Sequence, residues 1–189
     1  IPGGAAARPF ITHHNALNMD LYLRVAPELF LKRLLVGGIE RVFELNRNFR
    51  NEGISVRHNP EFTMLEFYQA YATYEDLMAL TEELFVSVAR EVAGSLKFSF
   101  GEHTIDLQPP WRRISPSDAL EQYGGATRAE IESLEGLRAF ARRRNISFDP
   151  GLPYGNLLVE VFEEIAEPHL IQPTFVVGYP LEVSPLARK

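Results

Sequence analysis

The sequence predicts an α+β fold, in which an antiparallel sheet is flanked by helices. Side chains alternate with a period of two over 41–52 and again over 62–71, and this period is typical of β-strands. Helix start and stop signals occur before this pair of strands, after it and, most densely, over 115–168. Neighbouring strands followed by grouped helices favour an α+β architecture over a parallel sheet built from alternating units.

The segment 41–71 is predicted to form a β-hairpin with a polar working face. One side of its first strand carries carboxylates, amides and an arginine, at Glu44, Asn46, Asn48, Arg50 and Glu52. One side of its second strand combines apolar and acidic residues, at Phe62, Met64, Glu66 and Tyr68. The connection over 53–61 is too long for a two-residue turn. Its basic residues, Arg57 and His58, suit a loop that folds over an anionic ligand.

Two elements are expected before this hairpin. The N-terminal loop contains paired glycines and runs into a short strand at about Arg8–Ile11. A helix is predicted from Pro27 to Val36, because proline favours the first helical position and Gly37 follows the apolar run. Glu28 lies in the first turn of that helix, where a carboxylate complements the helix dipole.

Helices dominate the prediction after the hairpin. In chain order, the expected elements are a helix over 73–94, a small hairpin over 96–107, a helical insertion over 115–168 that joins two parts of the sheet, and a strand over 174–178. Within the insertion, N-cap signals at Ser115 and Thr127 start the first helices, and further helices are predicted at 134–144 and 155–167.

Composition limits the class of protein. The 189 residues, 46% hydrophobic and 23% charged, predict one compact globular unit or most of one. The absence of cysteine excludes disulfides and thiolate zinc sites. No apolar run is long enough to cross a bilayer. Both observations suit a soluble cytoplasmic protein. The net charge of −6 argues against general nucleic-acid affinity. Residues 32–58 nevertheless hold six basic and three acidic side chains, so an anionic ligand is expected there.

FRNE at 49–52, followed by RHNPEFTMLE at 57–66, resembles motif 2 of the class II aminoacyl-tRNA synthetases, in the form carried by lysyl-tRNA synthetases. Further segments also resemble that family, so that the resemblance spans the chain: 3–10, 12–38 and 169–187. The resemblance implies that 1–189 is part of a class II catalytic domain, with the motif 2 hairpin at 41–71. The family's motif 3 and anticodon-binding domain have no counterpart in this sequence.

This resemblance implies ATP-dependent activation of lysine to lysyl adenylate and transfer to tRNA(Lys) by a homodimer. Arg50 is the implied catalytic residue, because the motif 2 arginine binds both the α-phosphate and the carboxylate of the amino acid, and a guanidinium fork donates bidentately to such anions. The implied ATP-binding residues are Arg50, Glu52, His58, Asn59 and Phe62. The implied lysine-binding residues are Gly4, Glu28, Arg50, Glu66 and Tyr68.

Other parts of the family's active site are expected beyond residue 189: the motif 3 arginine, the acidic Mg²⁺ ligands and the carboxylate that reads the lysine side chain. No metal ligand is therefore expected within this chain, and the chain alone is expected to be weakly active or inactive. Two alternatives stay open: a paralogue that attaches a lysine derivative to elongation factor P, and a non-catalytic module for dimerisation or ligand sensing. The segments HHNALNMDLYLR and PLEVSPLA favour the tRNA synthetase form.

Several of these residues also have a purely structural interpretation. Taken alone, Phe62 and Tyr68 favour core packing, and the surrounding motif reverses that preference. The basic cluster of the insertion lacks interleaved aromatic residues and is interpreted as a solvated helix end rather than an RNA contact; it consists of Arg138, Arg142, Arg143 and Arg144.

Overall fold

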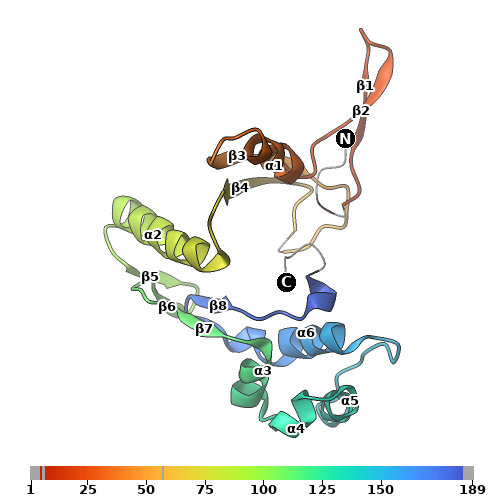
Figure 1. Ribbon diagram of the computed structural model, residues 1–189, viewed down its shortest axis with the longest axis vertical. Coiled ribbons are helices and arrows are strands. Elements are labelled where there is room, and N and C mark those ends of the chain that lie inside the picture. Colours follow the sequence, from red (N-terminus) through yellow and green to blue (C-terminus); the bar gives the residue numbers. More distant parts are fainter. Residues whose placement is uncertain (1–4, 6, 57, 185–189) are drawn as a thin grey trace. The chain divides into compact units, whose positions relative to one another are not determined.

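The computed structural model describes residue 5 and residues 7–56 and 58–184, and they fall into two compact units (Figure 1). The first unit is 1–74 and the second is 75–189, where composition predicted a single unit. Each unit has its own buried side chains. The two are therefore described separately.

The first unit contains two antiparallel hairpins and one helix. Its elements are β1 (Ile11–His14), β2 (Met19–Tyr22), α1 (Glu28–Val36), β3 (Arg41–Phe49) and β4 (Glu61–Gln69). The predicted strand at Arg8–Ile11 is wrong in its bounds, because the observed strand starts at Ile11 and pairs with β2, which sequence reasoning did not predict. Pro27 is the N-cap of α1 rather than its first helical residue.

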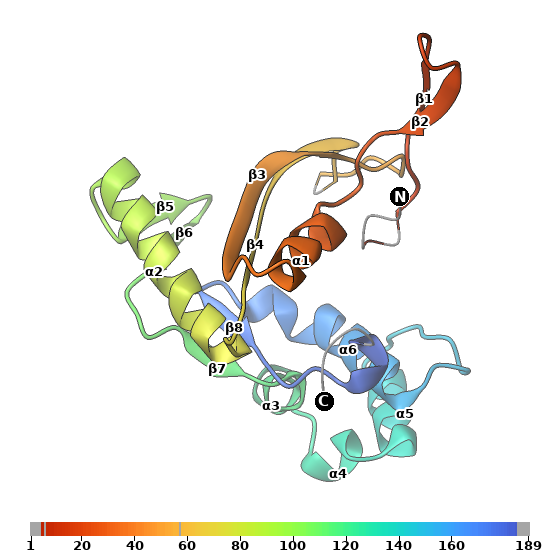
Figure 2. The ribbon, with the colours of Figure 1, turned by 45° about the horizontal axis from the view of Figure 1, so that its top comes forward.

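The hairpin of β3 and β4 confirms the predicted alternation. Glu44 lies opposite Glu66 and Asn48 lies opposite Phe62, so the polar sides of the two strands form one common face. This polar face is also the more buried one, since Asn48 is fully buried whereas Phe43 on the other face is 73% exposed. Helix α1 lies beside the hairpin and contacts both strands (Figure 2).

Two earlier segments are hydrogen-bonded to the end of β3. The Phe49 N–H donates to the Arg24 carbonyl at 2.7 Å, and the Asn51 N–H donates to the Arg8 carbonyl at 2.7 Å. The Leu23 N–H in turn donates to the Phe10 carbonyl at 3.0 Å. These bonds hold the segments that flank β1 and β2 against the point where β3 ends and the motif 2 loop begins.

The second unit has two pairs of strands and a set of packed helices. Its strands are β5 (Lys97–Phe100), β6 (His103–Asp106), β7 (Arg112–Ile114) and β8 (Thr174–Val176). Its helices are α2 (Tyr74–Ala93), α3 (Pro116–Ala119), the π-helical turn η1 (Leu120–Gly124), α4 (Arg128–Ile131), α5 (Leu134–Arg143), α6 (Tyr154–Ile165) and the 3₁₀ turns η2 (Glu167–His169) and η3 (Leu181–Val183).

The predicted helix starts of the insertion are confirmed. The side chain of Ser115 accepts from the Asp118 N–H, and that of Thr127 accepts from the Glu130 N–H in a complete capping box. The short strand β7 was not predicted, and it pairs in parallel with β8. The helices between these strands therefore form a crossover connection between two parallel partners.

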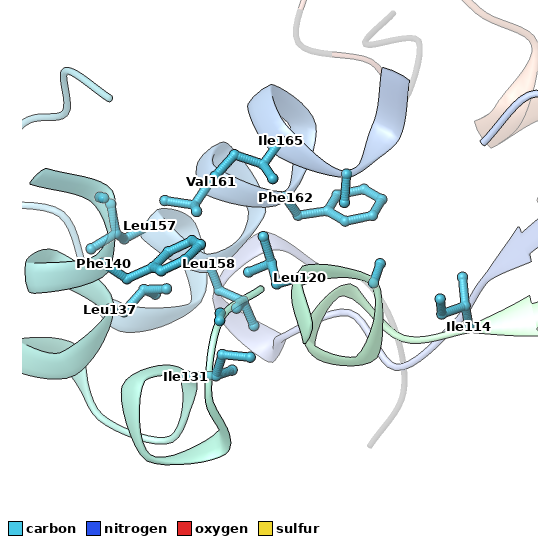
Figure 3. Packing of buried hydrophobic residues seen from close by; sticks show 14 residues of the cluster. Ile114, Leu120, Ile131, Leu137, Phe140, Leu157, Leu158, Val161, Phe162 and Ile165 are labelled. Atoms are coloured by element: carbon cyan, nitrogen blue, oxygen red, sulfur yellow. The ribbon is translucent and has the colours of Figure 1, made fainter. Parts of the chain in front are cut away.

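These helices share one hydrophobic core, in which side chains of η1, α5 and α6 meet (Figure 3). Leu120, Leu137 and Phe140 are fully buried there, together with Leu157 and Val161. Such packing stabilises helices that are individually too short to persist in water.

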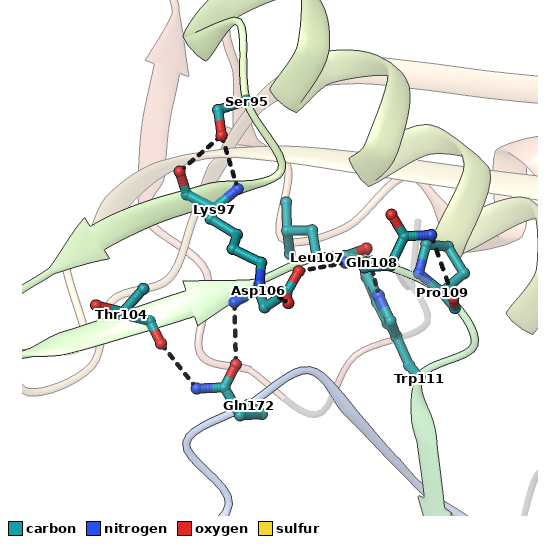
Figure 4. Close-up of polar contacts among 9 residues, drawn as sticks. All are labelled: Ser95, Lys97, Thr104, Asp106, Leu107, Gln108, Pro109, Trp111 and Gln172. Atoms are coloured by element: carbon teal, nitrogen blue, oxygen red, sulfur yellow. Dashed lines mark hydrogen bonds and ion pairs between the residues drawn. The ribbon is translucent and has the colours of Figure 1, made fainter.

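The open edge of β6 is covered by a side chain instead of a strand (Figure 4). The amide of Gln172 accepts from the Asp106 N–H at 3.0 Å and donates to the Thr104 carbonyl at 2.8 Å. Trp111 fixes the chain after β6, because its Nε1 donates to the Leu107 carbonyl at 3.0 Å. Within the described ranges, no helix is long and apolar enough to cross a membrane.

The core of the second unit makes a test of stability possible with a matched pair of phenylalanines. Phe140→Ala removes a fully buried ring and is expected to lower the free energy of unfolding by about 3–5 kcal/mol. Phe100→Ala removes a ring that is 72% exposed and is expected to cost far less. Urea unfolding followed by the fluorescence of Trp111, the single tryptophan, measures both. Equal losses in the two variants would contradict this core.

Candidate active site

Arg50 lies at the end of β3 and is held in place by the segment before α1. Its Nε donates to the Val25 carbonyl at 3.3 Å, and its guanidinium carbon lies 5.1 Å from the centroid of the Phe62 ring. Its own N–H donates to the Pro60 carbonyl at 2.8 Å, which closes the base of the loop. No residue of the described ranges accepts a hydrogen bond from either Nη of Arg50, so both remain directed donors for an anion.

A pocket of about 260 Å³ opens beside Arg50 at the mouth of the loop. It is lined by Arg50, Glu52, Gly53, His58, Asn59 and Phe62. The structure therefore brings together all five residues predicted for ATP, and Gly53 is an addition that the sequence analysis did not single out. The apolar ring of Phe62 could stack on a nucleobase, and the guanidinium of Arg50 and the ring of His58 could donate to phosphate oxygens.

The loop itself is ordered by a small turn next to the pocket. Ser55 and His58 exchange backbone hydrogen bonds of 3.1 and 3.2 Å, and the Ser55 hydroxyl lies 2.8 Å from Nδ1 of His58. This turn fixes the orientation of the His58 ring at the pocket wall. Arg57, predicted to form the basic tip, lies outside the described residues.

A second group of polar side chains lies where α1 meets the hairpin. The Tyr68 hydroxyl donates to Oε1 of Glu66, and Lys32 donates to Oε1 of Glu28. The Nζ of Lys32 is 5.6 Å from the centroid of the Tyr68 ring. Burial, and next the Glu66 carboxylate, raise the pKa of Tyr68, and Glu28 adds to this effect. Glu28, Glu66 and Tyr68, all predicted for lysine, therefore form one acidic group.

The two groups lie along one strip of the polar face. Phe62 and Glu66 are four residues apart on β4, which corresponds to about 13 Å along the strand. Arg50 lies at the Phe62 end, and Tyr68 lies two residues beyond Glu66. The strip therefore suits an elongated ligand with an aromatic end, an anionic middle and a cationic end. Gly4, the remaining residue predicted for lysine, lies outside the described residues.

Lys32 was missed as a site residue, although the sequence carried a signal for it. It follows Glu28 by four residues on a predicted helix, and oppositely charged residues at this spacing pair on one helix face. Asn48 is a different case, because alternation placed it on the polar face but did not predict its complete burial. Its Nδ2 donates to Oδ1 of Asn46 at 2.9 Å.

The arginines of the insertion are engaged within the fold. Arg138 donates to Glu135 at 2.8 Å and to the Pro150 carbonyl at 2.6 Å, and Arg144 donates to the Gly124 carbonyl at 3.3 Å. These contacts support the structural interpretation of the cluster. Among the residues with described positions, no group of three or more histidine, aspartate or glutamate side chains could hold a metal ion.

Comparison with known proteins identifies the family. Residues 1–189 match the family of tRNA synthetases class II (D, K and N), and the chain belongs to it. The heat-inducible lysine–tRNA ligase of Escherichia coli K12 is 56% identical over 190 residues, and a lysine–tRNA ligase of Shewanella loihica is 56% identical over 196 residues. A further lysine–tRNA ligase of E. coli K12 is 55% identical over 190 residues. The resemblance inferred from the motif 2 segment is confirmed.

The extent of these alignments defines which part of the family is present. Each alignment covers 100% of this chain and 38–39% of the relative. The chain thus spans about two fifths of the length of the curated relatives it matches. The roles of the individual site residues stay predictions.

The contact between Tyr68 and Glu66 predicts a pH effect of definite sign. The phenol keeps its proton to higher pH in the folded chain, so the contact contributes its full stability below pH ~10 and loses it as pH rises through the folded pKa. Glu66→Gln removes the carboxylate and is expected to lower the Tyr68 pKa. Glu61→Gln, on the same strand, is the control and should leave it unchanged. The free energy of unfolding in urea, followed as pH rises through ~10, should fall less steeply in Glu66→Gln than in Glu61→Gln and in the unaltered chain, and equal slopes in all three would contradict the contact.

Proposed function

We propose that this chain carries the ATP- and amino-acid-binding half of a lysine–tRNA ligase, which activates lysine with ATP and transfers it to tRNA(Lys). The observation that carries the proposal is the position of Arg50. It lines the pocket proposed for ATP, and it lies at the Phe62 end of the strip that runs along β4 to Glu66. The names of the relatives, all lysine–tRNA ligases, support lysine as the amino acid.

Arg50 is proposed to join the two reacting anions. Amino-acid activation forms a bond between a carboxylate oxygen and the α-phosphorus of ATP and breaks the bond to pyrophosphate. Two negatively charged groups must therefore approach each other, and the free Nη donors of Arg50 are directed donors that neutralise both. Because the Val25 carbonyl and the Phe62 ring already hold the guanidinium, little reorganisation is needed as charge develops on phosphorus.

The other side chains are proposed to position the two substrates. The Phe62 ring stacks on adenine, and His58 donates to the outer phosphates. Glu28 and Glu66 provide negative charge for the ammonium groups of lysine, and Tyr68 orients Glu66 through its hydrogen bond. Mg²⁺ would supply further charge neutralisation for the phosphates, held by ligands other than a cluster of the described residues.

The proposed homodimer is supported by the hairpin of β1 and β2. All eight residues of these strands are exposed, among them Ile11 and Tyr22. Four of these eight residues are large and apolar (Ile11, Met19, Leu21 and Tyr22), and exposed apolar side chains gathered on one element are a common feature of an interface. Dimerisation through this hairpin, and binding of tRNA(Lys) by the complete enzyme, are part of the proposal.

The first test of this function is lysine-dependent exchange of pyrophosphate into ATP. A chimaeric ligase, in which residues 1–189 replace the matched stretch of the heat-inducible E. coli lysine–tRNA ligase, provides the required length. Arg50→Ala is expected to lower kcat/KM for exchange at least a hundredfold, because removing a charge-stabilising donor typically costs about 10²–10³ in rate. Arg47→Ala is the matched control, since Arg47 is an exposed arginine on the opposite face of β3.

Four outcomes are informative. Exchange that depends on lysine and Arg50, but not on Arg47, supports the function. Near-normal exchange in Arg50→Ala would refute the assignment of Arg50. A chimaera that exchanges no pyrophosphate with lysine, while its E. coli parent does, would count against the proposed function itself. Transfer to elongation factor P instead of tRNA would support the paralogue.

The acidic group is expected to serve lysine rather than ATP. Glu28→Gln and Glu66→Gln keep the shape of the side chain and remove its charge, so each should raise KM for lysine at least tenfold, because charge-assisted contacts are worth about 1.5–3 kcal/mol. KM for ATP should change by no more than about twofold, because the pocket of Phe62 is a separate part of the strip. Steady-state exchange with each substrate varied in turn measures both constants. Equal weakening of lysine and ATP would argue against this division.

A further inference from the structure

The acidic group already contains an ammonium ion that the chain itself supplies. Lys32 follows Glu28 by one helical turn, donates to its carboxylate and places Nζ 5.6 Å from the centroid of the Tyr68 ring. A carboxylate on one side and an aromatic face on the other are the surroundings in which proteins bind ammonium groups. Lys32 therefore occupies the kind of environment that the proposed function assigns to an ammonium group of the amino acid.

We propose that Lys32 is an internal surrogate for the α-ammonium group of the substrate. Glu28 holds Lys32 in the free enzyme, and the incoming amino acid displaces the Lys32 ammonium into solvent and takes its place on Glu28. This inference rests on the proposed function and extends it, because it makes Lys32 a residue that sets amino-acid affinity and specificity.

The burial of the two partners supports an exchange in this direction. The side chain of Glu28 is 20% exposed, whereas that of Lys32 is 46% exposed. Because the Lys32 side chain is long, flexible and partly in water, its ammonium group can leave Glu28 and be solvated at once. The carboxylate is held closer to the protein and stays. The pair is therefore built so that the cation is the exchangeable member.

Charge balance gives the exchange a preference for lysine. With Lys32 in place, the acidic group holds one cation, Lys32, against the two carboxylates of Glu28 and Glu66. When the Lys32 ammonium leaves, both carboxylates are left for the incoming amino acid. Lysine brings two ammonium groups, one for each carboxylate. An amino acid with a neutral side chain brings only one, so displacing Lys32 costs it more than it costs lysine.

A different role for Lys32 predicts the opposite sign. If Lys32 served only to hold Glu28 in position, removing it would weaken binding of the amino acid. If it is a competitor, removing it strengthens binding. The two roles are separated by the direction of the change in KM, and Arg33 offers a matched control. Arg33 is the next cation on α1 and lies over the Phe30 ring, whereas the carboxylate of Glu28 is paired with Lys32.

The test compares Lys32→Met, Lys32→Arg and Arg33→Met in the chimaeric ligase. Lys32→Met is expected to lower KM for lysine about fivefold, since an exposed helix pair and a cation–π contact together are worth roughly that factor. The kcat for exchange and KM for ATP should stay within about twofold. Lys32→Arg, which keeps a competing cation, and Arg33→Met, which removes a neighbouring one, should both resemble the unaltered chain.

Two inhibitors identify which ammonium group Lys32 mimics. Norleucine has the α-ammonium group and no side-chain charge, whereas 6-aminohexanoate has a terminal ammonium and no α-ammonium group. Lys32→Met should lower the inhibition constant of norleucine by the same factor as KM for lysine, and should leave that of 6-aminohexanoate unchanged. The inference is overturned if KM for lysine rises or stays constant in Lys32→Met, or if only 6-aminohexanoate inhibits more tightly. In either case, lysine-dependent exchange by the unaltered chimaera still supports the proposed function. An unaltered chimaera without lysine-dependent exchange would remove both.

Discussion

The register of the β3–β4 hairpin is the constraint on which the candidate site depends. Asn48 pairs with Phe62 and Glu44 pairs with Glu66, so the polar residues of both strands share a face. A slip of one residue would turn every side chain of one strand to the opposite side. Arg50 would then leave the Phe62 ring, and the pocket and the acidic group would no longer belong to one strip.

In this hairpin the polar face is buried and the apolar face is exposed, which is the reverse of the usual half-buried antiparallel sheet. The face that carries Asn46 and Asn48 is covered, while Phe43 and Leu45 on the other face are 73% and 66% exposed. The cover comes from α1 and from the segment before it, whose backbone bonds to Phe49 and whose Val25 carbonyl accepts from Arg50. Covered polar groups interact in a low dielectric, where a charge–charge or charge–dipole contact is stronger than in water. The same cover that orders Arg50 therefore increases its effect on a bound anion.

The sequence predicted the parts of the fold that depend on local signals. The alternation of side chains predicted β3 and β4, and the N-cap signals predicted the helices that follow Ser115 and Thr127. The motif 2 segment indicated the family. Elements that depend on distant partners were missed, as in the three-residue strand β7, which is defined by its pairing with β8 sixty residues later. The pocket residues followed from the resemblance, but the contact of Lys32 with Tyr68 depends on how α1 packs and could only be read from the structure.

The most direct test of the account is a crystal structure of the chimaeric ligase with a non-hydrolysable analogue of lysyl adenylate. We expect the purine to lie on the Phe62 ring, the phosphate mimic to accept from the Nη atoms of Arg50, and the α-ammonium group of the analogue to replace Lys32 at Glu28. An analogue bound on the opposite face of the hairpin, beside Phe43 and Leu45, or bound without contact to Arg50, would contradict it.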